Sequence, residues 1–197
     1  MNPLTALPDP DPATLARLHA RLVDAAAADD TLDIAYRTVD TPLGELLLAA
    51  TPAGLVRVAY ASEGHDAVLA NLAAKVSPRM LRAPSRLDDP AREIDDYFAG
   101  RRHVFDLALD LQLAHGFRRE VLAHLRDIDY GRTASYSTVA AAAGRPTAVR
   151  AAASACATNP LPIVIPCHRV VRSDGSLGGY LGGVAAKQAL LTLESAA

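Results

Sequence analysis

The sequence predicts an α+β fold in which strands and helices occupy different parts of the chain. Residues 32–60 contain three short apolar segments separated by turns rich in Pro and Gly, which is typical of antiparallel strands. Residues 117–194 instead carry apolar side chains at helical spacing. The chain has 197 residues, and 50% of them are hydrophobic, so it can bury a core in one or two small domains.

The composition restricts the class of protein. Two cysteines are too few for a disulfide scaffold or a four-cysteine zinc site. The sequence shows neither a basic leader nor an apolar stretch of membrane length, so we expect a cytoplasmic protein with reduced thiols and no membrane partner. Residues 1–100 hold nine Lys/Arg and fifteen Asp/Glu, a net −6, whereas residues 101–197 hold eleven and seven, a net +4. The second half is therefore the half that could approach a polyanion.

Residues 1–31 are expected to form a tail followed by an additional helix over residues 13–28. Asp11 or Thr14 is expected to cap this helix. One side of the helix is made apolar by Leu15, Leu18 and Leu22. The simplest interpretation is a helix that packs against the rest of the protein.

Residues 32–100 are expected to form a small α/β domain. Its strands are predicted over residues 32–39, 45–50 and 55–60, with turns at Thr41-Pro42-Leu43-Gly44 and Thr51-Pro52-Ala53-Gly54. Two helices are predicted near residues 64–76 and 89–98, the second ending before Gly100. Residues 101–115 then form a linker.

Residues 116–197 are expected to form a helical domain. Its first helix has apolar side chains at Phe117, Val121, Leu125 and Ile128. Two shorter helices follow, one over residues 135–143 closed by Gly144, and one capped by Thr147 that extends to Ala157. Such a pair, joined by a tight turn, resembles a helix-turn-helix.

The second of these short helices has two different faces. One face consists of Val149, Ala152 and Cys156, and the other of Arg150, Ala153, Ser154 and Ala157. An ordinary alanine-rich packing helix would give the same pattern, because alanine is the best helix former. The functional interpretation is a thin helix that enters a narrow groove, with Arg150 as its probe.

The chemistry of the chain is concentrated at Cys167 and His168. A free thiol is mostly protonated at neutral pH, so a nucleophilic Cys167 needs a nearby base or cation. Adjacent side chains of an extended segment point apart, so His168 would act through a bridging water or at a bend. Glu194, on the last helix, is the candidate that orients the imidazole. The alternative is that this helix frays and Glu194 points to water.

Several motifs together resemble the methylated-DNA–protein-cysteine methyltransferase (O6-alkylguanine-DNA alkyltransferase) family. The resemblance covers about residues 32–194 and is most specific in the Pro-Cys-His-Arg-Val run that contains Cys167. Its other elements are Thr41-Pro42-Leu43-Gly44, Tyr97-Phe98-Ala99-Gly100, Gly131, Ser135-Tyr136, Ala140, Gly144, Pro146, Arg150-Ala151, Asn159-Pro160, Ile163-Val164-Ile165, Gly178-Gly179-Tyr180, Gly182-Gly183, Lys187, Leu190-Leu191 and Glu194.

The resemblance implies a ribonuclease H-like first domain, a helix-turn-helix second domain and single-turnover DNA repair. Cys167 would accept the alkyl group of O6-alkylguanine in double-stranded DNA, with O4-alkylthymine as a second candidate lesion. His168 would activate it through water, Glu194 would stand behind the histidine, and Asn159 would hold the turn. The implied DNA-binding residues are Tyr136, Arg150, Ala151, Ala153 and Ser154. The implied pocket residues are Pro162, Val170, Gly178, Gly179 and Tyr180. The resemblance implies a monomer that needs no metal or cofactor.

Two other functions fit parts of the sequence. A non-catalytic protein that binds alkylated DNA, of the alkyltransferase-like kind, would share the fold, but such proteins lack the cysteine that is present here at position 167. A Cys-His-Glu hydrolase would show turnover on a small acyl substrate and would be indifferent to DNA. The fate of Cys167 in the presence of alkylated DNA separates these functions.

Overall fold

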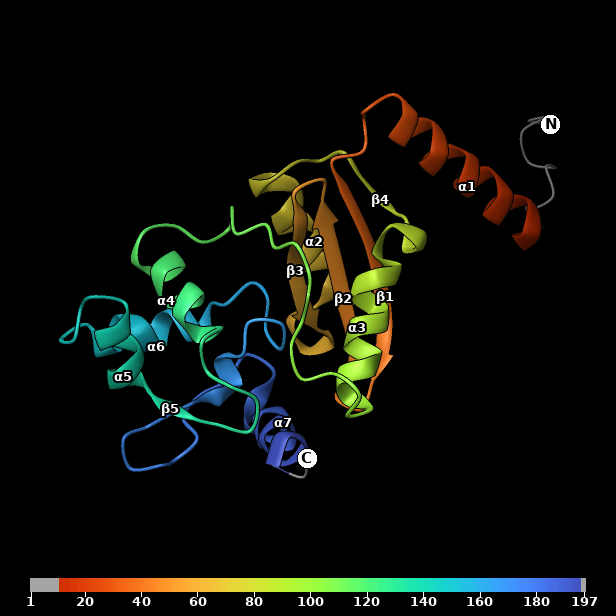
Figure 1. The fold of residues 1–197 in the computed structure, drawn as a ribbon. Helices are drawn as coiled ribbons and strands as arrows, with labels where there is room; N and C mark the ends of the chain where they lie inside the picture. The colour runs from red at the N-terminus through yellow and green to blue at the C-terminus, as the bar shows by residue number, and fades with distance from the viewer. Residues whose placement is uncertain (1–10, 196–197) are drawn as a thin grey trace, which may run out of the picture.

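The computed structural model describes residues 11–195, with an N-terminal part built on a β-sheet and a C-terminal part of short helices beside it (Figure 1). The sheet contains β1 (Ile34–Thr41), β2 (Gly44–Thr51), β3 (Gly54–Tyr60) and β4 (Met80–Arg82), in the order β3-β2-β1-β4. The three predicted strands are confirmed as an antiparallel meander. The short β4, which pairs with β1 in parallel, was not predicted.

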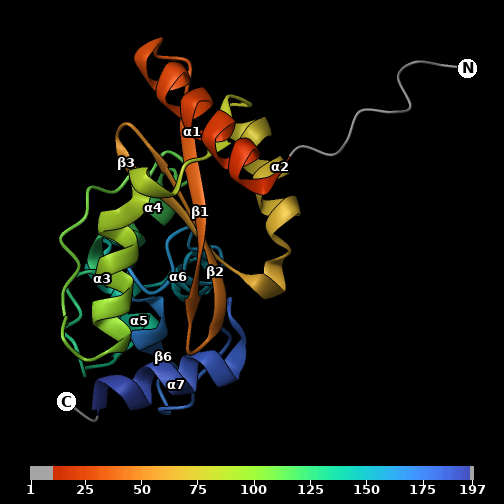
Figure 2. The ribbon, with the colours of Figure 1, turned by 90° about the vertical axis from the view of Figure 1, so that its right-hand side faces the viewer.

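The sheet buries both of its faces. Helix α2 (His65–Lys75) and helix α3 (Asp88–Phe98) lie on opposite sides of it (Figure 2). Alternate residues of β2 therefore belong to different clusters, because successive side chains of a strand point to opposite faces. Leu47 packs with Val68 of α2, whereas Leu46 belongs to the cluster that contains α3 and the core of the C-terminal part. The core thus continues from the sheet into the helices.

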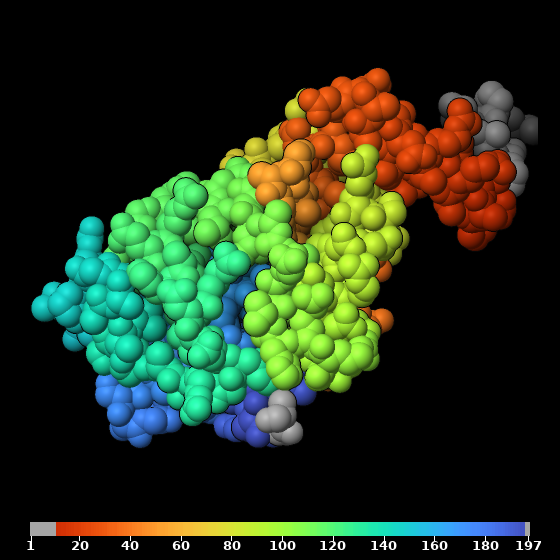
Figure 3. Space-filling model, in the orientation of Figure 1, coloured from red at the N-terminus to blue at the C-terminus, as the bar shows by residue number. Residues whose placement is uncertain are grey.

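Helix α1 (Pro12–Ala28) forms where expected, and the side chain of Asp11 caps it by accepting hydrogen bonds from the amides of Ala13 and Thr14. The expected packing is wrong, however. The side chains of the apolar stripe are exposed, Leu15 and Leu18 at 50% and Leu22 at 52%, and the residue that α1 buries is Val23. The reason is that α1 extends away from the sheet (Figures 1 and 3).

The segment over residues 101–115 follows the edge of the sheet. Leu55 of β3 receives a hydrogen bond at its carbonyl from the amide of Asp110 and donates one to the carbonyl of Ala108. Gly54 makes this approach possible, since a Cβ atom there would lie 2.3 Å from the carbonyl oxygen of Ala108. The segment between the two parts is therefore docked on β3.

The C-terminal part contains four helices in the described chain: α4 (Phe117–Leu125), α5 (Tyr136–Ala142), α6 (Val149–Ala157) and α7 (Gly183–Ser195). Strands β5 (Ala134–Ser135) and β6 (Val170–Val171) pair in parallel. The expected Thr147 cap is wrong, because α6 begins after Ala148 and has no side-chain cap. None of the helices within residues 11–195 is long and apolar enough to cross a membrane.

Candidate active site and DNA-facing helix

Cys167 lies on a single turn of 3-10 helix, η4 (Cys167–Arg169), which directly follows Pro166. This turn provides the bend that an extended segment would lack. The thiol is buried, with 2% of the residue exposed. Asn159 holds it in place: its side-chain amide donates to the Cys167 sulfur at 3.1 Å and to the carbonyl of Ile165 at 2.8 Å. The Asn159 side-chain oxygen accepts from the amide of Leu161, so the asparagine fixes the conformation of residues 159–167 around the sulfur.

His168 and Glu194 form a buried pair. The Nε2 atom of His168 lies 2.8 Å from Oε1 of Glu194, and Glu194 is 2% exposed. Glu194 thus points into the protein rather than to water. Because an ionised carboxylate only accepts hydrogen bonds, Nε2 carries the proton and Nδ1 keeps a free lone pair. Nδ1 is buried and has no hydrogen-bond partner within the described residues.

Three residues besides His168 hold Glu194. Arg169 donates to both carboxylate oxygens, Tyr97 of α3 donates its hydroxyl at 2.8 Å, and the amide of Gly131 donates at 3.1 Å. Burial alone would raise the pKa of Glu194, but the hydrogen bonds from His168 and Arg169 outweigh it and lower the pKa to about 2. Burial lowers the pKa of His168 in spite of the carboxylate, so the imidazole is neutral at pH 7.

Lys187 is a buried cation whose charge lowers the pKa of the Cys167 thiol. Its ammonium donates to the carbonyls of Val170 and Leu177, which ties the Cys167 turn (η4) to the glycine-rich loop over residues 174–183. Burial raises the pKa of Cys167 to about 11, and the Asn159 hydrogen bond and the Lys187 charge offset part of this rise. The thiol of the closed site is therefore protonated at neutral pH, and a base must remove its proton during reaction.

The glycine-rich loop packs over the site. Gly178 lies against Tyr136, since a Cβ atom at Gly178 would be 3.0 Å from the Tyr136 hydroxyl, and its φ is +66°. Tyr180 lies edge-on to His168, with ring centroids 6.3 Å apart. Gly179 is exposed, whereas Pro162 and Val170 are buried. The structure thus places Gly178 against Tyr136 and Tyr180 against His168.

Helix α6 turns one face inward and one face outward. Ala152 and Cys156 are buried, whereas Arg150 is exposed. The outer face otherwise carries only small side chains, namely Ala151, Ala153, Ser154 and Ala157. In Figures 1 and 3, α5 and α6 lie at the end of the molecule opposite α1, so their outer surface is free of the N-terminal helix.

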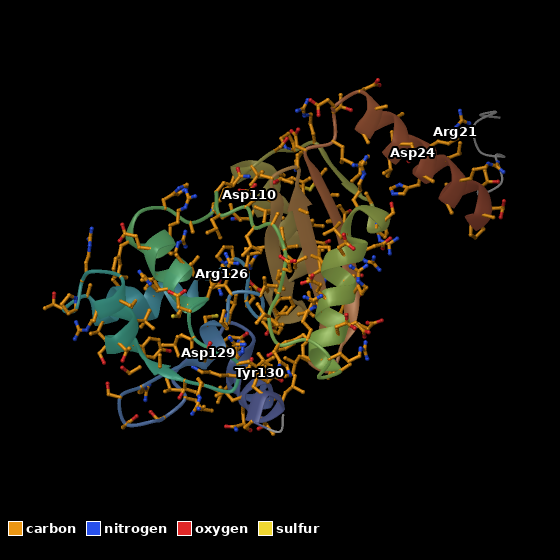
Figure 4. All side chains as sticks on the ribbon, in the orientation of Figure 1. Arg21, Asp24, Asp110, Arg126, Asp129 and Tyr130 are labelled. Atoms are coloured by element: carbon orange, nitrogen blue, oxygen red, sulfur yellow. The ribbon has the colours of Figure 1, made fainter. Side chains whose placement is uncertain are left out.

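Sequence reasoning missed several residues of this site. Arg169 and Tyr97 both bind Glu194, and Tyr130 stacks on His103 and lies under the Arg169 guanidinium (Figure 4). The signal for Arg169 was its position next to His168, since an arginine in an apolar run needs a buried carboxylate. Tyr97 carried no such signal. Among residues 11–195, no group of three or more His, Cys, Asp or Glu side chains is arranged to hold a metal ion.

The comparisons with known proteins agree on one family. Two family models match the chain: 6-O-methylguanine DNA methyltransferase, ribonuclease-like domain, over residues 34–111, and 6-O-methylguanine DNA methyltransferase, DNA binding domain, over residues 116–196. The methylated-DNA–protein-cysteine methyltransferase of Mycobacterium tuberculosis is 40% identical over 173 residues, which is 82% of this chain and 92% of that protein. The bifunctional transcriptional activator/DNA repair enzyme Ada of Escherichia coli is 39% identical, over 84% of this chain and 47% of that protein.

Solved structures lead to the same assignment. The crystal structure of Mycobacterium tuberculosis OGT in complex with DNA superposes with a TM-score of 0.73 at 34% identity, covering 82% of this chain and 93% of that one. An O6-methylguanine-DNA methyltransferase from Pyrococcus kodakaraensis, at 21% identity and a TM-score of 0.60, shares the fold. This chain therefore belongs to the methylated-DNA–protein-cysteine methyltransferase family.

Proposed function

We propose that this protein binds DNA and repairs it by moving the alkyl group of an O6-alkylguanine onto Cys167, once per protein molecule. The observation that carries the proposal is the buried arrangement of Cys167, His168 and Glu194, in which the free lone pair of the imidazole is left for the thiol. O4-alkylthymine is a second candidate substrate, because it presents the same alkyl–oxygen bond on a base edge.

The proton transfer follows from the site's geometry. Glu194 fixes the His168 tautomer, so Nδ1 is the basic atom, and a water between Nδ1 and the Cys167 sulfur would carry the proton. The thiolate then attacks the alkyl carbon: the S–C bond forms, the C–O6 bond breaks, and its electron pair stays on guanine. The proton first taken from Cys167 ends on the guanine, which is restored as the neutral base within the DNA strand. Water does not hydrolyse the thioether that forms on Cys167, so each protein molecule reacts only once.

Cys167 can react only with a base that has left the helix stack. With 2% of the residue exposed, its sulfur cannot reach a base edge inside a duplex, so the nucleotide must be turned out of the helix. We propose that α5 and α6 act as a helix-turn-helix whose second helix lies in the minor groove. The small outer side chains of Ala151, Ala153 and Ser154 would allow close approach, and Arg150 would fill the gap in the stack.

The remaining predicted residues have roles around the rotated base. Tyr136 would press on the backbone of the target nucleotide, and Asn159 would hold the Cys167 turn. Tyr180 would form a wall of the base pocket. The rest of that pocket would be lined by Pro162, Val170, Gly178 and Gly179. The close approach of Gly178 to Tyr136 supports a pocket that these two residues share.

We place the first domain at residues 32–100, a linker at 101–115 and the DNA-binding, alkyl-acceptor domain at 116–197, with an additional segment at 1–31. The family-model matches, over residues 34–111 and 116–196, support the start of the second domain near residue 116, and the first match extends into the segment that we name the linker. We further propose a monomer that works in the cytoplasm. Both cysteines are free thiols, which suits a reducing compartment, and the proposed site is complete within one chain.

The test is the mass of the protein after reaction with a duplex that contains O6-methylguanine. We expect one added methyl group, on the peptide that contains Cys167, and no further turnover. Cys167→Ala should remain folded and gain no methyl group, whereas Cys156→Ala, which changes the other buried thiol, should still be methylated. Binding of the duplex without a mass change would instead support a non-catalytic lesion binder, and repeated cleavage of an ester would support a hydrolase.

A further inference from the structure

The N-terminal part reaches the proposed base pocket through Tyr60. This residue ends β3, on the sheet, and is 3% exposed. Its hydroxyl lies 2.9 Å from the hydroxyl of Tyr180, and the two rings meet edge-on with centroids 5.9 Å apart. Two residues that are 120 positions apart in the chain thus share a hydrogen bond beside Cys167.

The glycine-rich loop is shaped around this tyrosine. A Cβ atom at Gly182 would lie 2.7 Å from the Tyr60 ring, so any larger residue at position 182 would push the loop off the sheet. Tyr60 and Cys167 also belong to the same apolar cluster. The loop that carries Tyr180 is therefore packed against the N-terminal part as well as against the Cys167 turn.

Tyr60 is itself held rigidly. Its amide donates to Glu63 at 2.9 Å, and Glu63 forms a partly buried ion pair with Arg57 of β3. Arg57 also donates to the carbonyl of Pro160 at 3.1 Å, and the amide of Val58 donates to the same carbonyl at 2.9 Å. The end of β3 is thus fixed to the turn that begins with Asn159. The Tyr60 hydroxyl, which bonds to the loop, therefore comes from a residue whose backbone is held in place.

Given the proposed function, we infer that Tyr60 is a positioning residue that holds Tyr180 in place and thereby limits the size of alkyl group that the pocket accepts. If Tyr180 is a wall of the pocket, the hydrogen bond to Tyr60 fixes how far that wall can move. On this inference, a methyl group would enter without movement of the wall. A benzyl group would require Tyr180 to shift, which would break the hydrogen bond and leave a buried hydroxyl without a partner.

The hydrogen bond persists over the working pH range. Burial raises the pKa of Tyr60 and that of Tyr180 above their ordinary values. Both phenols therefore stay neutral, and in a neutral pair one hydroxyl donates while the other accepts.

The experiment compares single-turnover transfer from two duplexes, one with O6-methylguanine and one with O6-benzylguanine. Tyr60→Phe keeps the ring and the packing against Gly182 but removes the hydroxyl. We expect the benzyl-to-methyl rate ratio to rise about tenfold in Tyr60→Phe, the size of effect that loss of one neutral hydrogen bond allows. Tyr180→Phe should change the ratio similarly, and the double variant should change it no more than either single variant. Tyr36→Phe, which alters a half-buried tyrosine on the other face of the sheet, is the matched control and should not change the ratio.

Each outcome decides the inference. A ratio that stays constant while both rates fall equally would mean that Tyr60 only supports the fold, and effects that add in the double variant would mean that it does not act through Tyr180. Either result overturns the inference. The proposed function fails in a different way, since the unmodified protein would then leave O6-methylguanine unchanged and gain no methyl group.

Discussion

The Cys167 turn and the outer face of α6 lie in the same C-terminal part, yet they are built in opposite ways. Around Cys167, the side chains of Asn159, Glu194 and Lys187 are buried and each makes hydrogen bonds to another segment. The outer face of α6 has one long side chain, Arg150, on a surface of alanine and serine. The difference indicates that the proposed chemistry is organised before DNA arrives, whereas the proposed contact with DNA depends on shape and on one arginine.

The largest expected effect on the transfer rate is at the hydrogen-bonded site around Cys167. His168→Ala should slow transfer at pH 7 by about a hundredfold or more, because it removes the general base. Its residual rate should then rise about tenfold per pH unit from pH 7 to 9, since the thiol, with a pKa of about 11, must ionise unaided. In the unmodified protein the pKa of His168 lies below 6.5, so the rate should be flat over the same range. Single-turnover rates across pH provide the measurement, and parallel profiles would contradict the assigned role.

Glu194→Gln should have the next largest effect. It leaves Arg169 buried without its carboxylate and should lower the free energy of unfolding by about 3 kcal/mol or more, as measured by urea denaturation. Transfer should slow by about tenfold to a hundredfold, less than in His168→Ala, because the imidazole is still present. Glu120→Gln, the same change at an exposed position, is the control and should have little effect.

The Glu194 carboxylate also makes the free energy of unfolding depend on pH in acid. The pKa of Glu194 is about 2 in the folded protein and 4.5 ordinarily, so its contribution to stability is complete above about pH 4.5 and is lost as the pH falls toward 2. The lowered pKa of His168 acts in the same direction below pH 6.5, because the unfolded chain then binds a proton that the folded one does not. Glu194→Gln should therefore lose less stability between pH 5 and pH 3 than the unmodified protein.

A smaller effect is expected on the DNA-facing side. Arg150→Ala should slow transfer from duplex DNA by about tenfold, because about 1.4 kcal/mol of the unstacking cost is no longer offset. Transfer from the free O6-alkylguanine base should change much less, since no stack is opened. Arg126→Ala, at another exposed arginine of the C-terminal part (Figure 4), is the control. If the transfer rate fell equally on the duplex and on the free base, Arg150 would not fill the gap in the base stack.

The smallest effect is expected at α1, which lies far from both regions. Arg21 and Asp24 extend from this helix away from the body of the protein (Figure 4). Leu18→Gln should change the free energy of unfolding by no more than about 0.5 kcal/mol, because its side chain is already exposed. Val23→Ala should cost about 1 kcal/mol or more, because Val23 is the residue that α1 buries. Thermal denaturation distinguishes the two, and a large loss in Leu18→Gln would mean that the stripe has a partner in solution.

The elements with strong local signals were predictable. The strands of the meander and helices α2, α3 and α5 lie within about two residues of their expected positions, because periodicity and glycine turns are local properties. Strand β4 was missed because three residues are too few to show alternation. The Thr147 cap was wrong because the chain does not enter the helix until Val149.

The sequence by itself determined the family and the α+β fold and pointed to the proposed nucleophile, since a Pro-Cys-His-Arg-Val run and glycine turns are readable without coordinates. Only the tertiary structure decided that Glu194 faces His168, that Tyr97 and Arg169 share that carboxylate, and that Tyr60 reaches Tyr180. The physical reason is separation along the chain. A partner 97 or 120 residues away leaves no local pattern, because its position is set by how the sheet and the helices pack and not by its neighbours in sequence.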